Sequence, residues 1–282
     1  MILVIGATGN VGRHVLSQLH AMGRADVRAL VPPTDAASAR VPHGISVAVG
    51  NLDAPDGLTE ALTGIKTVFL VWPFLSTEGA PAVLEAIARH AQRLVYVSSI
   101  GVDGRPEERD DPIFRLHAGM EGLIEESGLP RTVLRADTIA SNTLSWAEQI
   151  RTTGVVRGPL TAPTAVIDPR DIAAVAVRTL TDDSHLGATY RLTGPRVISR
   201  PEQVLAIGAA IDRELRFEEV AVQDARAQML ADGRPPALVD ALLSAAENRS
   251  ASSLVTSTVA DLTGQPPRSF HQWARDHRES FR

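Results

Sequence analysis

The sequence predicts an α/β fold in which helices cover both faces of a doubly wound parallel sheet, and two observations support this. In the first half of the chain, short apolar runs rich in β-branched residues alternate with helical stretches. Each run is apolar almost throughout, as expected for strands that are covered on both faces. Repeated strand–helix units imply parallel strands joined by right-handed crossovers.

The predicted strands and helices follow one another closely from Met1 to about Arg135. The strands are Ile2–Ile5, Val27–Val31, Ile45–Val49, Thr67–Val71, Leu94–Ser98 and Thr132–Arg135. The helices between them are Val11–Met22, Leu58–Leu62, Ala80–Ala91 and Ile113–Glu126. Gly128 and Pro130 follow the last helix and are a strong signal for its end.

Helices dominate after Arg135. They are predicted over Ile139–Thr153, Asp171–Leu180, Pro201–Ala210, Ala225–Leu230, Pro236–Ala246, Ser257–Leu262 and Phe270–His277, with strands at Gly154–Pro159 and Ala188–Leu192. We therefore expect residues 1–140 to form the sheet domain, with 167–193 returning to it. Residues 141–166 and 194–282 would form a smaller, mainly helical lobe. Such a lobe would close over the carboxyl edge of the sheet, where ligands bind in open α/β folds.

Composition excludes several functions. A net charge of -5 argues against nucleic acid or anionic membrane as the main partner. There is no cysteine, which excludes disulfides and thiolate catalysis, and no histidine pair has metal-ligand spacing, so no metal site is predicted. The opening residues do not resemble a signal peptide, and the apolar run Val68–Leu75 is far too short to span a membrane. We therefore expect a cytoplasmic protein, either a monomer or a homodimer, that acts on a small molecule.

A glycine-rich turn lies between the first strand and the first helix. Gly6 would allow the tight turn, Gly9 would let the backbone approach a pyrophosphate, and Gly12 would let the helix pack closely on the strand. The helix N-terminus would then direct its amides at the phosphates. Because a strand and a helix flank the motif, a Rossmann dinucleotide site is favoured over a purely structural turn. The loop residues expected at the cofactor are Gly6, Thr8, Gly9, Asn10, Val11 and Gly12.

The spacing G-x-x-G-x-x-G, with Ala7-Thr8 inside it, resembles the short-chain dehydrogenase/reductase superfamily, and most closely its atypical NmrA-like branch. The resemblance extends along the chain through Gly50-Asn51-Leu52, Val95-Tyr-Val-Ser98-Ser99, Ser127-Gly-Leu-Pro-Arg-Thr-Val-Leu-Arg135 with Asn142 after it, and Pro266-Pro-Arg-Ser-Phe270-His-Gln-Trp273. It implies an NAD(P)H-binding, quinone-reductase-like protein. It also implies adenine contacts at Asn51 and Leu52.

The choice between NADH and NADPH depends on the end of the second strand. An acidic residue there favours NAD and a basic residue favours NADP, but this sequence continues Pro32-Pro33-Thr34-Asp35. Many NmrA-like proteins have an arginine at this point. Arg13 and Arg40 can reach a 2′-phosphate and Asp35 can bond a 2′-hydroxyl, although a solvated surface charge is the favoured interpretation of each. The resemblance alone slightly favours NADP(H).

The usual catalytic pair of short-chain enzymes, Tyr-x-x-x-Lys, is absent. The only tyrosines, Tyr96 and Tyr190, are not followed by lysine at that spacing, and Lys66 is the only lysine. His117 stands on the corresponding helix with Glu121 one turn later. His117 can serve as the proton donor, with Glu121 raising its pKa. A half-buried histidine beside a carboxylate is an equally weighted alternative.

Polar and aromatic residues at the strand ends complete the expected site. Ser98 and Ser99 end the fifth strand, where a hydroxyl can bond the nicotinamide ribose or a substrate oxygen. The alternative role for these serines is strand-end capping. Ser99 is taken with His117 as a catalytic candidate, and Ser98 as a cofactor contact.

Trp72 and Pro73 follow the fourth strand and are expected at the cofactor, with Phe74 beside them at the substrate. Core packing is the alternative, and it suits Phe74 better than Trp72. Asn142 and Trp146, one helical turn apart, are expected to face the same pocket. The segment Asp168-Pro169-Arg170-Asp171 is interpreted as a helix start with ion pairs.

The function predicted is NAD(P)H-dependent reduction of a small apolar acceptor, such as a quinone or conjugated carbonyl. Hydride transfer mainly needs proximity and orientation, and a quinone can take its protons from water or from His117. Two alternatives stay open: a non-catalytic NAD(P)-binding redox sensor that regulates a partner, and a tailoring reductase or isomerase of secondary metabolism. The composition is a hint of a tailoring enzyme. Of the 28 basic residues all but one are arginine, which is typical of GC-rich bacterial genomes, where secondary metabolism is common.

Overall fold

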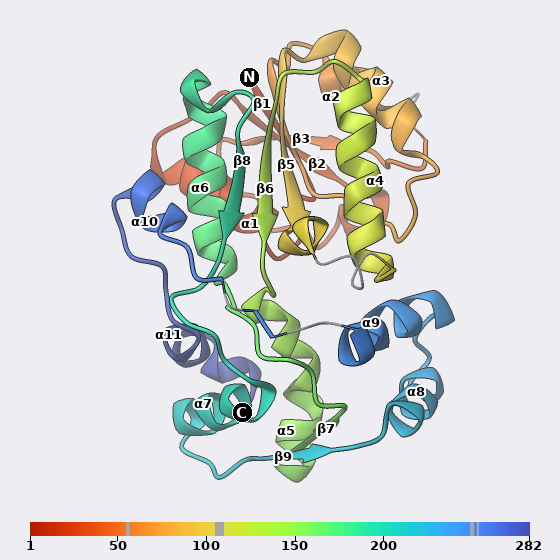
Figure 1. Cartoon of the computed structure of the whole chain (residues 1–282). Helices are drawn as coiled ribbons and strands as arrows, with labels where there is room; N and C mark the ends of the chain where they lie inside the picture. The colour runs from red at the N-terminus through yellow and green to blue at the C-terminus, as the bar shows by residue number, and fades with distance from the viewer. Residues whose placement is uncertain (55–56, 105–109, 249–250, 253) are drawn as a thin grey trace.

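A computed structural model describes residues 1–54, 57–104, 110–248, 251–252 and 254–282. Seven parallel strands form its central sheet in the order β3-β2-β1-β4-β5-β6-β8 (Figure 1). The strands are β1 (Ile2–Ile5), β2 (Val27–Val31), β3 (Ser46–Val49), β4 (Thr67–Leu70), β5 (Arg93–Ser99), β6 (Arg131–Ala136) and β8 (Thr189–Leu192). The order reverses between β1 and β4, which is the switch point where doubly wound sheets bind their ligands. The predicted fold class is confirmed.

Helices cover both faces of this sheet. Helices α1 (Gly12–Ala21) and α6 (Pro169–Thr181) pack on one face, and α2 (Leu58–Leu62), α3 (Ala80–His90) and α4 (Pro112–Glu126) pack on the other. Successive residues of β1 enter opposite cores: Val4 lies with α1 and α6, and Leu3 lies with α2 and α3. This alternation explains why the buried strands are apolar throughout.

Strand β3 departs from the expectation that every strand is covered on both faces. Ser46, Val47 and Val49 are exposed, because β3 is an edge strand that pairs only with β2. Its apolar sequence therefore predicted the strand correctly and its burial wrongly.

The segment after β6 also differs from expectation. Instead of one α-helix over Ile139–Thr153, a 3₁₀ helix (Ala140–Trp146) precedes a shorter α5 (Ala147–Thr153). A small second sheet pairs β7 (Val155–Gly158) in parallel with β9 (Arg216–Glu219). Strand β9 was not predicted, because its residues Arg-Phe-Glu-Glu are largely exposed and carry no apolar pattern.

The second lobe is mainly helical. Trp273, on α11 (Phe270–Asp276), is fully buried in a core that also contains residues of α5 and α7 (Arg200–Ile211). Helices α8 (Val222–Ala231) and α9 (Pro236–Asn248) form a smaller pair. Helix α10 (Thr258–Thr263) was expected in this lobe, and that placement is wrong: Val259 is buried in the core under α1 and α6. Within the described ranges, no helix is both long and apolar enough to cross a membrane.

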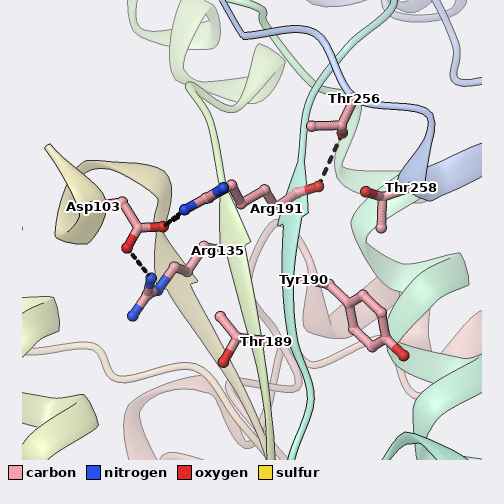
Figure 2. A pocket seen from close by; sticks show the side chains of 7 residues that line it. All are labelled: Asp103, Arg135, Thr189, Tyr190, Arg191, Thr256 and Thr258. Carbon is pink, nitrogen blue, oxygen red and sulfur yellow. Dashed lines mark hydrogen bonds and ion pairs between the residues drawn. The ribbon is translucent and has the colours of Figure 1, made fainter.

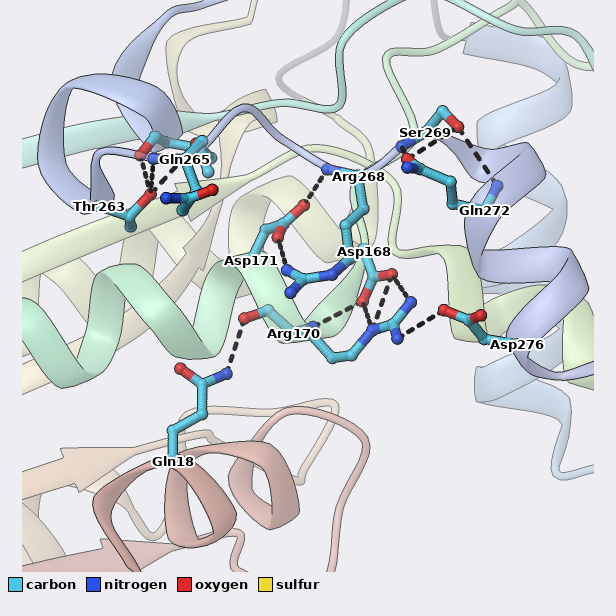
Figure 3. A network of polar contacts seen from close by, with 11 residues as sticks. Gln18, Asp168, Arg170, Asp171, Thr263, Gln265, Arg268, Ser269, Gln272 and Asp276 are labelled. Atoms are coloured by element: carbon cyan, nitrogen blue, oxygen red, sulfur yellow. Dashed lines mark hydrogen bonds and ion pairs between the residues drawn. The ribbon is translucent and has the colours of Figure 1, made fainter. Parts of the chain in front are cut away.

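A polar network joins the sheet domain to the C-terminal segment (Figure 3). The carboxylate of Asp168 caps α6 and pairs with Arg170, which reaches Asp276 of α11 at 2.7 Å. Buried Asp171 accepts hydrogen bonds from the backbone amide of Arg268 at 2.6 Å and from its guanidinium. The interpretation of this segment as a helix start with ion pairs is confirmed.

Candidate cofactor and active site

The glycine loop has the close contacts that its sequence predicts. Gly6 has φ +82°, a left-handed conformation that favours glycine. A Cβ atom on Gly12 would lie 2.1 Å from the carbonyl oxygen of Gly6, which no side chain can accommodate without backbone movement. A Cβ on Gly9 would lie 3.2 Å from the same oxygen, a milder conflict. Gly12 therefore allows α1 to pack against the turn, and Gly6 allows the turn itself.

The same loop is open where a ligand would approach. Thr8, Gly9 and Asn10 are exposed, while Ala7 and Val11 are buried beneath them. In the part of the chain that the structure describes, no side chain caps the start of α1. Arg13 and His14 donate their backbone amides to the carbonyls of Gly9 and Val11. An anion here would meet the exposed loop residues and the positive end of the α1 dipole, and the loop fits a dinucleotide pyrophosphate. Val11 would contribute its backbone, since its side chain is in the core.

Two turns at the carboxyl edge lie where an adenosine would be expected. Thr8 donates a hydrogen bond to the carboxylate of Asp35 at 2.7 Å, which joins the glycine loop to the segment after β2. After β3, exposed Asn51 donates to Asp53 at 3.0 Å, whereas Leu52 is only 5% exposed and packs in the core. Asn51 is thus the accessible residue of the predicted adenine turn.

The turn after β4 reverses the expected roles of its aromatic residues. Trp72 is only 6% exposed, and its indole N–H donates to the carbonyl of Ser76 at 2.8 Å. Phe74 packs edge-on against it and is half-buried, and Pro73 is exposed. Core packing therefore describes Trp72 better than Phe74, contrary to the preference drawn from the sequence. The indole can be buried beside a proline because the turn folds back to satisfy its N–H.

The two serines at the end of β5 have partners of their own. Ser98 is buried and donates to Glu121 at 2.5 Å. Ser99 accepts a hydrogen bond from the amide of Gly101 at 3.3 Å and caps the 3₁₀ turn Ile100–Asp103. Capping is thus observed for Ser99. Direct cofactor or substrate contacts by either serine stay predictions.

His117 makes a contact in this region that was not expected from the sequence. Its Nδ1 lies 2.8 Å from the hydroxyl of Tyr96, a fully buried residue in the middle of β5. Burial, and then the charge of Glu121, raise the pKa of Tyr96 well above its usual range, so the phenol stays neutral. From the sequence, Tyr96 was considered only as a possible member of a Tyr-x-x-x-Lys pair. Its contact with His117 was not predicted, because the two residues are 21 positions apart and no sequence pattern links them.

Glu121, which was expected to act on His117, is bonded by residues of β5 and β6. It accepts two hydrogen bonds from Arg135, at 3.0 Å and 2.5 Å, in addition to that from Ser98. Hydrogen bonding to Glu121 raises the pKa of Arg135 further above its usual value, so this guanidinium is permanently charged. The carboxylate is held mainly by this cation, a role that the sequence analysis did not assign.

Arg135 continues this network into a pocket of about 420 Å³ (Figure 2). Asp103 pairs there with both Arg135 and Arg191. The lining is contributed by the 3₁₀ turn after β5, β6, edge strand β8 and the start of α10 with the segment before it, and it comprises Asp103, Arg135, Thr189, Tyr190, Arg191, Thr256 and Thr258. This pocket lies at the β8 edge of the sheet, with three strands between β8 and β1, and is separate from the glycine loop.

Asn142 and Trp146 do not share a helical face in the way expected. They lie in the 3₁₀ helix, where about three residues complete a turn, so residues four apart point in different directions. Asn142 is exposed, whereas Trp146 packs partly against the core of the smaller lobe. Among the residues described, no cluster of three histidine, aspartate or glutamate side chains could hold a metal ion.

A doubly wound sheet with this glycine loop at its switch point defines a Rossmann dinucleotide-binding protein. Residues 6–183 match the family model described as NAD(P)H-binding. The chain belongs to that family, in its NmrA-like, atypical short-chain branch, and the predicted resemblance is confirmed.

Curated relatives extend along the whole chain. The chain is 39% identical to a (4-alkanoyl-5-oxo-2,5-dihydrofuran-3-yl)methyl phosphate reductase of Streptomyces griseus, over 100% of this chain and 99% of the relative. It is 34% identical to an NAD(P)H azoreductase of Xenophilus azovorans, with the same coverage. The expectation that the chain is an enzyme of the NAD(P)H-dependent, atypical short-chain class is confirmed at the level of the class.

Solved structures show the same fold. Triphenylmethane reductase of Citrobacter sp., complexed with NADP(H), superposes with a TM-score of 0.83 at 18% identity and covers 99% of this chain and 100% of that one. The NADPH-dependent quinone oxidoreductase of Escherichia coli superposes with a TM-score of 0.80 at 22% identity, covering 98% and 99%. At these identities the likeness concerns the fold alone.

Proposed function

We propose that this protein reduces the conjugated double bond of a small unsaturated carbonyl compound, with an unsaturated lactone as the favoured acceptor class. The observation that carries the proposal is the 39% identity, over the whole chain, to a reductase whose substrate is a furanone. A furanone of that kind is a conjugated carbonyl, which is one of the two acceptor classes expected from the sequence. A quinone is the second candidate, favoured by 25% identity to quinone oxidoreductase 2 of Escherichia coli.

The glycine loop and the first turn of α1 would hold the pyrophosphate of the cofactor, and Asn51 would lie at the adenine. Reduced nicotinamide supplies the hydride in such a reaction; the β carbon of the acceptor receives it, and one proton must reach the α carbon. The NmrA-like resemblance taken alone favours NADPH as the donor, whereas the carboxylate of Asp35 beside the glycine loop favours NADH.

His117 is the residue we assign to proton delivery. It is half-buried in the second turn of α4, near the helix end that lies at the carboxyl edge of the sheet beside α9 (Figure 1). Tyr96 holds one ring nitrogen at 2.8 Å and so fixes the orientation of the imidazole. Imidazole is the side chain most often used for general acid–base catalysis near neutral pH.

The test is turnover of purified protein with NADH or NADPH and four acceptors: an acylated butenolide with a phosphate ester, the same butenolide without it, menadione, and an azo dye. We expect oxidation of the cofactor with a butenolide. The variant His117→Gln should lower kcat about 100-fold, because a general acid contributes roughly 10²–10⁴ in rate. His20→Gln, exposed on α1, is the matched control and should retain full activity. Cofactor binding without reduction of either butenolide would refute the proposal.

A further inference from the structure

We propose that Asp35 makes this chain select NADH over NADPH. The inference rests on nucleotide binding at the glycine loop and not on the choice of acceptor. Asp35 ends the 3₁₀ turn Pro33–Asp35, which follows β2 after Pro32. In Rossmann domains a residue at this place meets the 2′ position of the adenosine ribose, where an acid bonds a hydroxyl and a base accommodates a phosphate.

The position of Asp35 is fixed by the structure around it. Its backbone amide donates to the carbonyl of Pro32 at 2.9 Å, and its carbonyl accepts from the amides of Ser38 and Ala39 at 2.9 Å and 2.8 Å. Ala39 and Val41 pack against the core under α1. The carboxylate is therefore part of a folded turn rather than a free surface charge.

The carboxylate points at the glycine loop. Its Oδ2 accepts from the hydroxyl of Thr8 at 2.7 Å, and its Oδ1 accepts from Thr34 at 3.2 Å. Thr8 is an exposed residue of the loop that would hold the pyrophosphate. Asp35 thus lies beside the nucleotide site, with its oxygens bonded by hydroxyls rather than by an arginine that would neutralise it.

Hydrogen-bonding capacity then separates the two cofactors. An ionised carboxylate can accept about four hydrogen bonds, and Thr8 and Thr34 supply two of them. A ribose 2′-hydroxyl can donate a further one. A 2′-phosphate has only acceptor oxygens and carries negative charge, so it meets repulsion at the same place.

Two basic residues, Arg13 and Arg40, could oppose this choice. Pro32 occupies the position directly after β2, where a basic side chain would accompany NADP. Arg13 and Arg40 are both exposed, and solvent and salt screen exposed charges. Asp35 is only partly exposed and is hydrogen-bonded to Thr8, so its charge is held beside the loop.

Calorimetric titration of the protein with NAD⁺ and NADP⁺ tests this without any acceptor. We expect NAD⁺ to bind at least about tenfold more tightly than NADP⁺, since unpaired like charges oppose binding. Asp35→Asn keeps an acceptor for Thr8 and removes the charge, so it should raise NADP⁺ affinity about tenfold and leave NAD⁺ affinity within about threefold. Asp26→Asn is the control, because Asp26 is exposed at the opposite end of β2 and should not change the ratio.

Tighter binding of NADP⁺ by the wild-type protein, or an unchanged ratio in Asp35→Asn, would overturn the inference. Thermal melting of each variant with and without NAD⁺ shows whether the turn still folds. Failure to reduce any butenolide would refute the proposed function and leave the binding ratio as it stands.

Discussion

The hydroxyl of Tyr96 lies 2.8 Å from Nδ1 of His117 and connects a fully buried strand residue to the one histidine that we assign to proton delivery. Because this bond fixes the imidazole, its loss should impair proton transfer more than acceptor binding. We expect Tyr96→Phe to lower kcat about tenfold with little change in KM, and to alter the pH profile of kcat.

A double-mutant cycle separates positioning from a structural effect. If Tyr96 acts through the histidine, Tyr96→Phe should have no further effect on kcat in a His117→Gln background. A tenfold loss in both backgrounds would show that the phenol matters for packing alone.

Gly12 provides the sharpest test of the loop geometry. Its missing Cβ would lie 2.1 Å from the carbonyl oxygen of Gly6, so Gly12→Ala must push α1 away from the turn. We expect a loss of about 3 kcal/mol in unfolding free energy, since overpacking typically costs 1–3 kcal/mol and here the obstacle is backbone. Detectable NAD⁺ binding should be lost as well.

The matched control for Gly12 is Gly122 in α4. It is exposed, and a Cβ there meets nothing within 4 Å. Gly122→Ala should therefore be neutral or stabilise the protein by up to about 1 kcal/mol. Urea unfolding and calorimetry measure both variants, and wild-type cofactor affinity in Gly12→Ala would contradict the assigned role.

Much of the fold was predictable because its signals are local. Strands β1 and β2 coincide with the predicted ranges, since each is a short apolar run with polar residues or glycine beyond it. Strand β9 was missed because charged residues form it, and the 3₁₀ helix Ala140–Trp146 was predicted as α-helix because the two share polar and apolar spacing over one turn.

The site was less predictable because its contacts join distant segments. The glycine loop could be interpreted residue by residue, since strand, turn and helix are consecutive. Glu121 was placed beside His117 by helical spacing, whereas its bonds to Arg135 depend on how α4 packs across β6. The contact between Thr8 and Asp35, 27 positions apart, likewise depends on how the turn after β2 folds back.

The ion pair of Glu121 with Arg135 should contribute measurably to stability. The two side chains are 14% and 16% exposed, so Glu121→Gln leaves a poorly solvated guanidinium with only Asp103 to balance it. We expect the unfolding free energy to fall by about 2 to 3 kcal/mol, somewhat less than for a fully buried pair. Chemical denaturation measures this loss.

The exposed pair of Glu85 with Arg89 is the comparison. Both side chains are 65% exposed, so Glu85→Gln should cost less than about 1 kcal/mol. Equal losses of unfolding free energy in Glu121→Gln and Glu85→Gln would mean that the Glu121–Arg135 pair contributes no more to stability than an exposed ion pair.

His14 on α1 should make stability depend on pH. Burial, followed by the positive charge of Arg13, lowers the pKa of His14 from 6.5 to about 4. Between these two values the unfolded chain binds a proton that the folded chain does not, so the unfolded state gains stability as the pH falls. The contribution of neutral His14 is complete above pH 6.5 and is lost as the pH falls towards 4. The slope for this residue should be below about 1.4 kcal/mol per pH unit, because its side chain is only partly buried.

Urea unfolding at several pH values from 7 down to 4 measures this slope. Other groups also titrate in that range, so the decisive quantity is the difference between the wild-type protein and His14→Gln, which carries no titratable group. The wild type should lose stability faster than the variant between pH 6.5 and pH 4. His20→Gln, exposed on the same helix, should follow the wild-type curve. Parallel curves for the wild type and His14→Gln would show that His14 is protonated in the folded protein at its ordinary pKa.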